Sequence, residues 1–110
     1  MNAEHYTYRV IWSEEDNEFV GLCAEFPSLS WLDAKQGAAL AGMVSLVEQT
    51  VADMEANGEP IPDPLSLQRF SGKFMVRTTP EVHRRLAAQA MENGISLNRL
   101  VNSKLQEHGG

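Results

Sequence analysis

Residues 72–81 read Gly-Lys-Phe-Met-Val-Arg-Thr-Thr-Pro-Glu, and this stretch decides the fold of the C-terminal half. Its first seven residues predict a short strand that contains aromatic and β-branched side chains. Successive side chains of a strand point to opposite faces, so Phe74, Val76 and Thr78 should share one face. Residues 79–81 then begin a helix, because Thr is a good N-cap, Pro suits the first helical position and Glu favours the positive end of the helix dipole.

Two short helices follow this strand. The first ends at Asn93-Gly94, a typical helix stop, and Ser96 is placed to cap the second. Apolar residues recur at helical spacing on one face of each helix: Val82, Leu86, Ala87 and Ala90 on the first, and Leu97, Leu100, Val101 and Leu105 on the second. The sequence therefore predicts one strand and two helices between Gly72 and Leu105.

A unit of this kind is expected to work only as a dimer. About forty residues with one strand and two short helices cannot bury a sufficient core alone, and a lone strand leaves its backbone groups unpaired. Two copies solve both problems if they pair their strands antiparallel and interlock their helices, with Phe74, Val76 and Thr78 inside. The alternative is a short edge strand of an ordinary α/β domain whose charges are solvated.

The outer face of such a two-stranded ribbon has a shape and chemistry suited to DNA, because a ribbon fits the major groove. Lys73 and Arg77 can donate to guanine edges or phosphates, and Met75 can contact a thymine methyl group. The N-terminus of the second helix offers backbone N–H groups to a phosphate. The candidate DNA-binding residues are therefore Lys73, Met75, Arg77, Ser96, Leu97 and Asn98.

The N-terminal half predicts a small α/β domain. Residues 6–13 and 18–25 are expected to form a strand hairpin, and residues 29–33 a short third strand. Residues 34–56 predict an amphipathic helix, and three prolines between positions 60 and 64 predict a rigid, extended segment. We therefore expect an α+β protein with a three- to four-stranded antiparallel sheet and one long helix in residues 1–64, a linker over 65–71, and the dimeric DNA-binding domain over 72–110.

The charge is divided unequally along the chain. Residues 1–66 contain two basic and twelve acidic residues, a difference of −10, whereas residues 67–110 contain seven basic and three acidic residues, a difference of +4. The two halves are thus expected to prefer partners of opposite charge, a basic one for the first and nucleic acid for the second.

Several classes of function are disfavoured by what the sequence contains. No apolar stretch is long enough to span a bilayer, no secretory signal precedes the first strand, and Cys23 is the single cysteine, which favours a cytoplasmic protein. The carboxylates of Glu14, Glu15, Asp16 and Glu18 are most simply a solvated turn. We therefore expect no metal, no cofactor and no enzymatic activity, with a metal-dependent nuclease as the alternative that Glu25 and Asp33 leave open.

Three runs resemble a known family: residues 72–77, 79–87 and 94–101 look like the ribbon-helix-helix fold of the Arc and CopG repressors. They are more closely similar to the C-terminal domain of HicB antitoxins, including the Ser-Leu-Asn step at 96–98 and Leu105. The N-terminal half is also similar to HicB, in Phe-Val-Gly at 19–21, Glu-Phe-Pro at 25–27 and Gly-Glu-Pro-Ile-Pro at 58–62. The resemblance covers about residues 6–105. Residues 27–35 depart from it, since the family often has a Gly-rich turn there.

The resemblance implies a type II antitoxin. In that family the N-terminal domain is a partial RNase H-like fold that binds HicA, a small basic RNA-cleaving toxin, and the C-terminal dimer binds operator DNA and represses the operon. The expected partners are thus a HicA-like toxin, operator DNA and a second copy of the chain, with a tetramer left open and no membrane. The alternative function is a stand-alone ribbon-helix-helix transcriptional regulator without a toxin.

Overall fold

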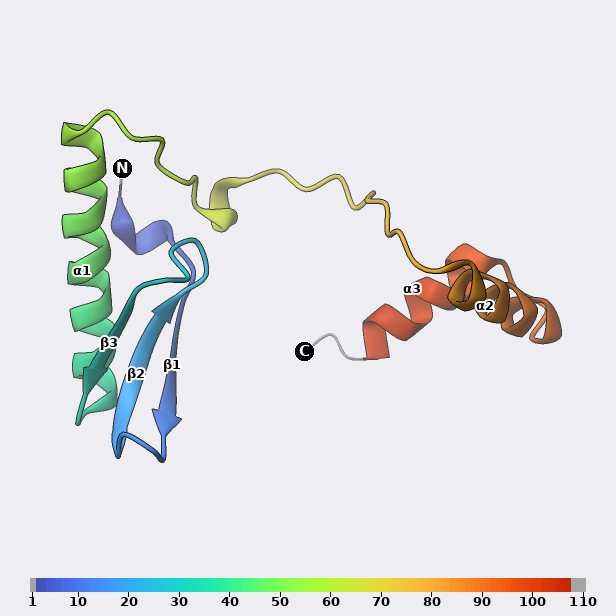
Figure 1. The fold of residues 1–110 in the computed structure, drawn as a ribbon, viewed down its shortest axis with the longest axis horizontal. Coiled ribbons are helices and arrows are strands. Elements are labelled where there is room, and N and C mark those ends of the chain that lie inside the picture. The colour runs from blue at the N-terminus through green and yellow to red at the C-terminus, as the bar shows by residue number, and fades with distance from the viewer. Residues whose placement is uncertain (1, 108–110) are drawn as a thin grey trace. The chain divides into compact units, whose positions relative to one another are not determined.

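The N-terminal half is built on a three-stranded antiparallel sheet. In the computed structural model, which describes residues 2–107, the strands are β1 (Tyr8–Ser13), β2 (Glu18–Cys23) and β3 (Ser30–Asp33), in the order β1-β2-β3 (Figure 1). The three expected strands are thus confirmed with shorter ends, and the described residues contain no fourth. The β1–β2 turn includes Asn17, whose φ of 53° lies in the left-handed region that Asn tolerates.

The helix α1 (Gln36–Ala56) covers one face of the sheet and confirms the helix expected over residues 34–56. Its buried residues recur every four positions, which places them on one side of the helix: Ala39, Met43, Val47 and Val51. Met43 and Val47 pack in the core with Tyr6, Cys23 and Phe26. Cys23 is buried in this core, since only 3% of its surface is exposed.

Two glycines let helix and sheet approach each other closely. Gly21 lies at the centre of the sheet, paired with Val10 on one side and Trp31 on the other. A Cβ at Gly21 would lie 2.7 Å from the carbonyl oxygen of Ala39, and a Cβ at Gly42 would overlap the indole ring of Trp31. The absence of a side chain at Gly21 therefore allows α1 to lie close to this face of the sheet, because any side chain there would push the helix away.

The segment after α1 folds back onto the same unit. The Tyr6 hydroxyl donates to the Pro62 carbonyl oxygen at 2.8 Å. The Glu25 carboxylate accepts hydrogen bonds from the backbone N–H of Leu65 at 2.8 Å and from the backbone N–H and hydroxyl of Thr7 at 2.9 and 3.0 Å. Ser66, in the short 3-10 helix η2 (Leu65–Leu67), donates to the His5 carbonyl oxygen at 2.6 Å. Residues just before β1 and just after β2 thus hold residues 62–66 in place.

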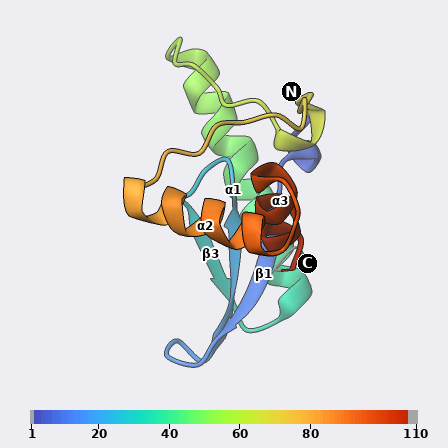
Figure 2. The same cartoon turned by 90° about the vertical axis from the view of Figure 1, so that its right-hand side faces the viewer.

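The C-terminal unit begins after Ser71, where the chain divides into two compact units. It contains α2 (Pro80–Glu92) and α3 (Leu97–Glu107), which pack on each other and cross steeply (Figure 2). The expected caps are confirmed: the hydroxyls of Thr79 and Ser96 accept hydrogen bonds from the N–H groups of Val82 and Arg99. Gly94 ends α2 with φ of 67°. Residue 1 and residues 108–110, the ends of the expected domains, lie outside the described residues.

The strand expected over residues 72–78 is not present in the single chain. Phe74 and Val76, expected to point inward, are 75% and 66% exposed. The physical reason is that a strand needs a neighbour for its ladder of hydrogen bonds, and no other segment of the described chain pairs with this one. The strand propensity of residues 72–78 is thus not enough to form a strand within one chain. The single chain therefore does not form the ribbon-helix-helix arrangement.

We predict that Gly21→Ala destabilises the N-terminal unit by about 1–3 kcal/mol, because the added methyl group meets a helix carbonyl that cannot move without shifting α1. The measurement is urea unfolding followed by tryptophan fluorescence, since both tryptophans, Trp12 and Trp31, lie in this unit. Gly37→Ala is the matched control, because a Cβ there meets open space and should be neutral or slightly stabilising. Equal midpoints for the two variants would contradict the close approach at Gly21.

We also predict a pH-dependent contribution from Glu25. Burial alone raises the pKa of Glu25, but the hydrogen bonds from Leu65 and Thr7 outweigh it and hold the pKa below its ordinary value of 4.5. The stabilisation is therefore complete above pH 4.5 and is lost as the pH falls through the folded-state pKa. Glu25→Gln should lower the free energy of unfolding by about 1 kcal/mol at pH 7. In acid, the free energies of unfolding of the variant and of the unaltered chain should become more alike. An equal cost of Glu25→Gln at pH 7 and in acid would contradict this contribution.

Candidate functional site

The C-terminal unit has a large hollow bounded by residues 72–78, α2 and α3, with a volume of about 1440 Å³. Its apolar lining comes from all three segments: Phe74, Val76, Val82, Leu86, Leu97, Val101 and Leu105. Within the described residues of this unit, only Ala90 and Leu100 are buried hydrophobic side chains. The apolar face expected from the helical spacing therefore exists, and it is incompletely covered in the single chain: its helical residues are mostly half-buried, and Phe74, Val76 and Leu105 are exposed.

The candidate DNA-binding residues of the 72–78 segment are accessible. Met75 is 80% exposed, and Lys73 and Arg77 are exposed as well. Lys73 and Arg77 also line the hollow, beside Phe74 and Val76. In the single chain, the basic and the apolar side chains of residues 72–78 are thus not on opposite faces. The reason is that these residues form no strand, in which successive side chains would alternate between two faces.

The other candidates lie at the start of α3. The Ser96 hydroxyl accepts a hydrogen bond from the Arg99 N–H at 3.0 Å, so this side chain acts as the helix cap. Leu97 and Asn98 occupy the first two helical positions, where backbone N–H groups have no acceptor within the helix. Their side chains line the same hollow as Lys73 and Arg77. The structure thus brings four of the six candidates around one hollow, whereas Met75 and Ser96 do not line it.

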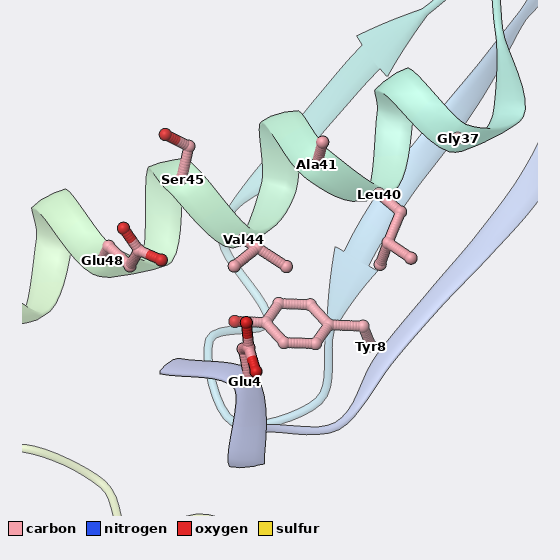
Figure 3. Close-up of a pocket in the computed structure, with 8 residues that line it drawn as sticks. All are labelled: Glu4, Tyr8, Gly37, Leu40, Ala41, Val44, Ser45 and Glu48. Carbon is pink, nitrogen blue, oxygen red and sulfur yellow. The ribbon is translucent and has the colours of Figure 1, made fainter. Parts of the chain in front are cut away.

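A second concave surface lies on the N-terminal unit, and it was not predicted from the sequence. This groove, of about 550 Å³, is formed by α1, β1 and the 3-10 helix η1 (Ala3–His5), and its lining residues are Glu4, Tyr8, Gly37, Leu40, Ala41, Val44, Ser45 and Glu48 (Figure 3). The lining residues of α1 recur at spacings of three and four along one side of the helix. That spacing was the available signal, but it does not reveal which side of α1 the sheet leaves open.

Tyr8 forms one wall of the groove. Its hydroxyl donates to the Ala3 carbonyl oxygen at 2.7 Å, which fixes the ring against η1. Burial raises the pKa of Tyr8 to about 12, with smaller contributions from Cys23, Glu25 and Glu48, so the hydroxyl stays protonated and neutral. Figure 3 shows Glu4 and Glu48 at the hydroxyl end of the ring, and Leu40 near its other end.

The carboxylates considered for metal binding do not form a cluster of ligands. Glu14 accepts a hydrogen bond from the Trp12 indole at 2.7 Å, and Asp16 accepts one from the Ser13 hydroxyl at 2.9 Å. Over residues 2–107 no group of three or more His, Cys, Asp or Glu side chains is arranged to hold a metal ion. None of the helices in that range is both long and apolar enough to cross a membrane.

Comparisons with known proteins give one match. The family model of the HicB family matches residues 56–105, which include the end of α1, the proline-rich segment, α2 and most of α3. No match was found among curated proteins or among solved structures. The matched segment contains the hollow of the C-terminal unit and every candidate DNA-binding residue. Residues 56–105 are thus similar to the HicB family.

Proposed function

We propose that the protein is the antitoxin of a type II toxin–antitoxin system, which neutralises a HicA-like RNA-cleaving toxin and represses its own operon as a dimer. The observation that carries this proposal is the HicB family match over residues 56–105. An antitoxin of this kind binds its partners without catalysis and acts in the cytoplasm, where both the operon and the messenger RNA are found.

The division of charge supports two binding surfaces. The twelve acidic residues among positions 1–66 favour association with a basic protein, and a small RNA-cleaving toxin is expected to be basic because it binds a polyanion. The seven basic residues among positions 67–110 favour the phosphate backbone of DNA. Each half of the chain thus suits one of the two partners that the function requires.

The open apolar face supports dimerisation through the C-terminal unit. Pairing of two 72–78 segments would satisfy their backbone groups and turn Phe74 and Val76 toward the apolar residues of α2 and α3. The same pairing would turn Lys73, Met75 and Arg77 outward as a ribbon suited to the major groove. The proposed ribbon-helix-helix domain therefore forms its DNA-binding surface in the same step as its core.

A stand-alone transcriptional regulator is the second candidate. It is favoured by the fact that the HicB match begins at residue 56 and leaves the sheet and most of α1 outside the matched segment. The two functions share the DNA-binding dimer and differ in the partner of the N-terminal unit.

The toxin partner is tested by co-expressing the tagged full chain with the reading frame that adjoins its gene, which is expected to encode a short basic protein under the proposed function. We expect the two products to copurify, and the chain to restore growth of cells in which the neighbour alone is toxic. Operator binding without any complex would leave the stand-alone regulator as the function. Loss of both activities would overturn the two candidates together.

The ribbon is tested by substituting adjacent residues that are both exposed in the single chain. Val76→Asp should abolish dimerisation in analytical ultracentrifugation, because it places a charge inside the paired core. Met75→Asp should leave the dimer intact and weaken binding to operator DNA in a gel shift at fixed salt, as should Arg77→Ala, by about 10- to 100-fold. The reverse assignment, with dimerisation lost in Met75→Asp and kept in Val76→Asp, would show that the register is shifted by one residue.

A further inference from the structure

The groove on the N-terminal unit has an apolar floor. Leu40, Val44 and the ring of Tyr8 approach one another across it, as Figure 3 shows. Leu40 is 42% exposed, although it is a large hydrophobic side chain within a helix that otherwise packs on the sheet. The floor is accessible because α1 makes more of its contacts with β2 and β3 than with β1, which leaves the β1 side of the helix partly uncovered.

One end of the groove consists of hydrogen-bond acceptors. Glu4 from η1 and Glu48 from α1 are both exposed carboxylates at this end. The Tyr8 hydroxyl donates its one hydrogen bond to the Ala3 carbonyl oxygen, so its oxygen can only accept further hydrogen bonds. Glu4 and Tyr8 lie close together in the sequence, whereas Glu48 is brought to them by the packing of α1. This end is therefore suited to a cation with several donors.

An apolar floor that ends in acceptors matches the chemistry of lysine and arginine side chains. Both have an aliphatic stem that packs on apolar surface and a charged end that seeks polar partners. We propose that this groove is the site at which the N-terminal unit receives a lysine or arginine side chain from its protein partner. The partner is the basic toxin, so the inference rests on the proposed function and adds the surface that meets it.

The charge of the whole unit supports a basic protein as the occupant. The surplus of ten acidic residues over positions 1–66 attracts such a partner over a distance, and the groove gives it a defined contact. Loss of an exposed ion pair costs little, but removal of one partner from a pair that is desolvated between two proteins costs much more, because the other charge is left unpaired. Reversal of a groove charge should therefore weaken binding far more than reversal of a charge elsewhere on α1.

The test measures binding of the full chain to the purified product of the adjoining reading frame by titration calorimetry at fixed salt. Glu48→Lys should weaken binding at least ~10-fold. Asp53→Lys is the matched control, since it makes the same change of charge at another exposed site on α1 and should alter binding less than ~3-fold. The shape of the groove is tested with Ala41→Phe, which fills the groove and should weaken binding. Its control is Ala52→Phe, which adds the same ring at an exposed position outside the groove and should leave binding nearly unchanged.

The outcomes separate this inference from the proposed function. If the unaltered chain does not bind the toxin, both the docking site and the antitoxin function are contradicted. If it binds and the groove variants bind as tightly as their controls, the groove is not the docking site, although the antitoxin function stands. Tryptophan fluorescence during urea unfolding shows whether each variant is folded. Glu48→Gln gives a milder change of charge should Glu48→Lys unfold, and it should still weaken binding several-fold.

Discussion

The C-terminal unit is constrained by the small amount of apolar surface that it can bury alone. Ala90 and Leu100 are its buried hydrophobic side chains within the described residues, whereas ordering each residue costs on the order of 1–2 kcal/mol of conformational entropy. Two short helices joined at Gly94 cannot offset that cost through their mutual contact. The apolar residues of α2, α3 and residues 72–78 therefore need further burial. Under the proposed function, a second copy of the chain provides it.

Local signals in the sequence predicted the helices and their ends well. Thr79 and Pro80 place the start of α2, Ser96 caps α3, and Gly94 adopts the left-handed conformation that ends α2. Each of these signals acts within about four residues, so no knowledge of the tertiary structure was needed. The strands of the N-terminal unit were also predicted, because each has a neighbour in the same chain to complete its ladder.

Two features could not be predicted from the sequence, because they depend on contacts between segments that are distant along the chain or on another chain. The strand expected over residues 72–78 was wrong for the single chain, since β structure requires a partner and propensity alone does not supply one. The groove was missed because it depends on where α1 lies across the sheet. That position follows from the close approach of Ala39 to Gly21 and of Trp31 to Gly42, which bring Glu48 to Tyr8 and Glu4.

The two proposed surfaces differ in what they require to form, and this difference has a consequence for regulation. The groove consists of residues from a single folded unit, so binding of toxin there does not require dimerisation. The proposed DNA-binding ribbon would require two chains, so its formation would follow mass action and fall steeply as the chain becomes dilute. When the antitoxin is depleted, repression should thus weaken before neutralisation does, because only repression depends on pairing. Under the proposed function, the operon would then be transcribed again while the remaining chains still hold the toxin.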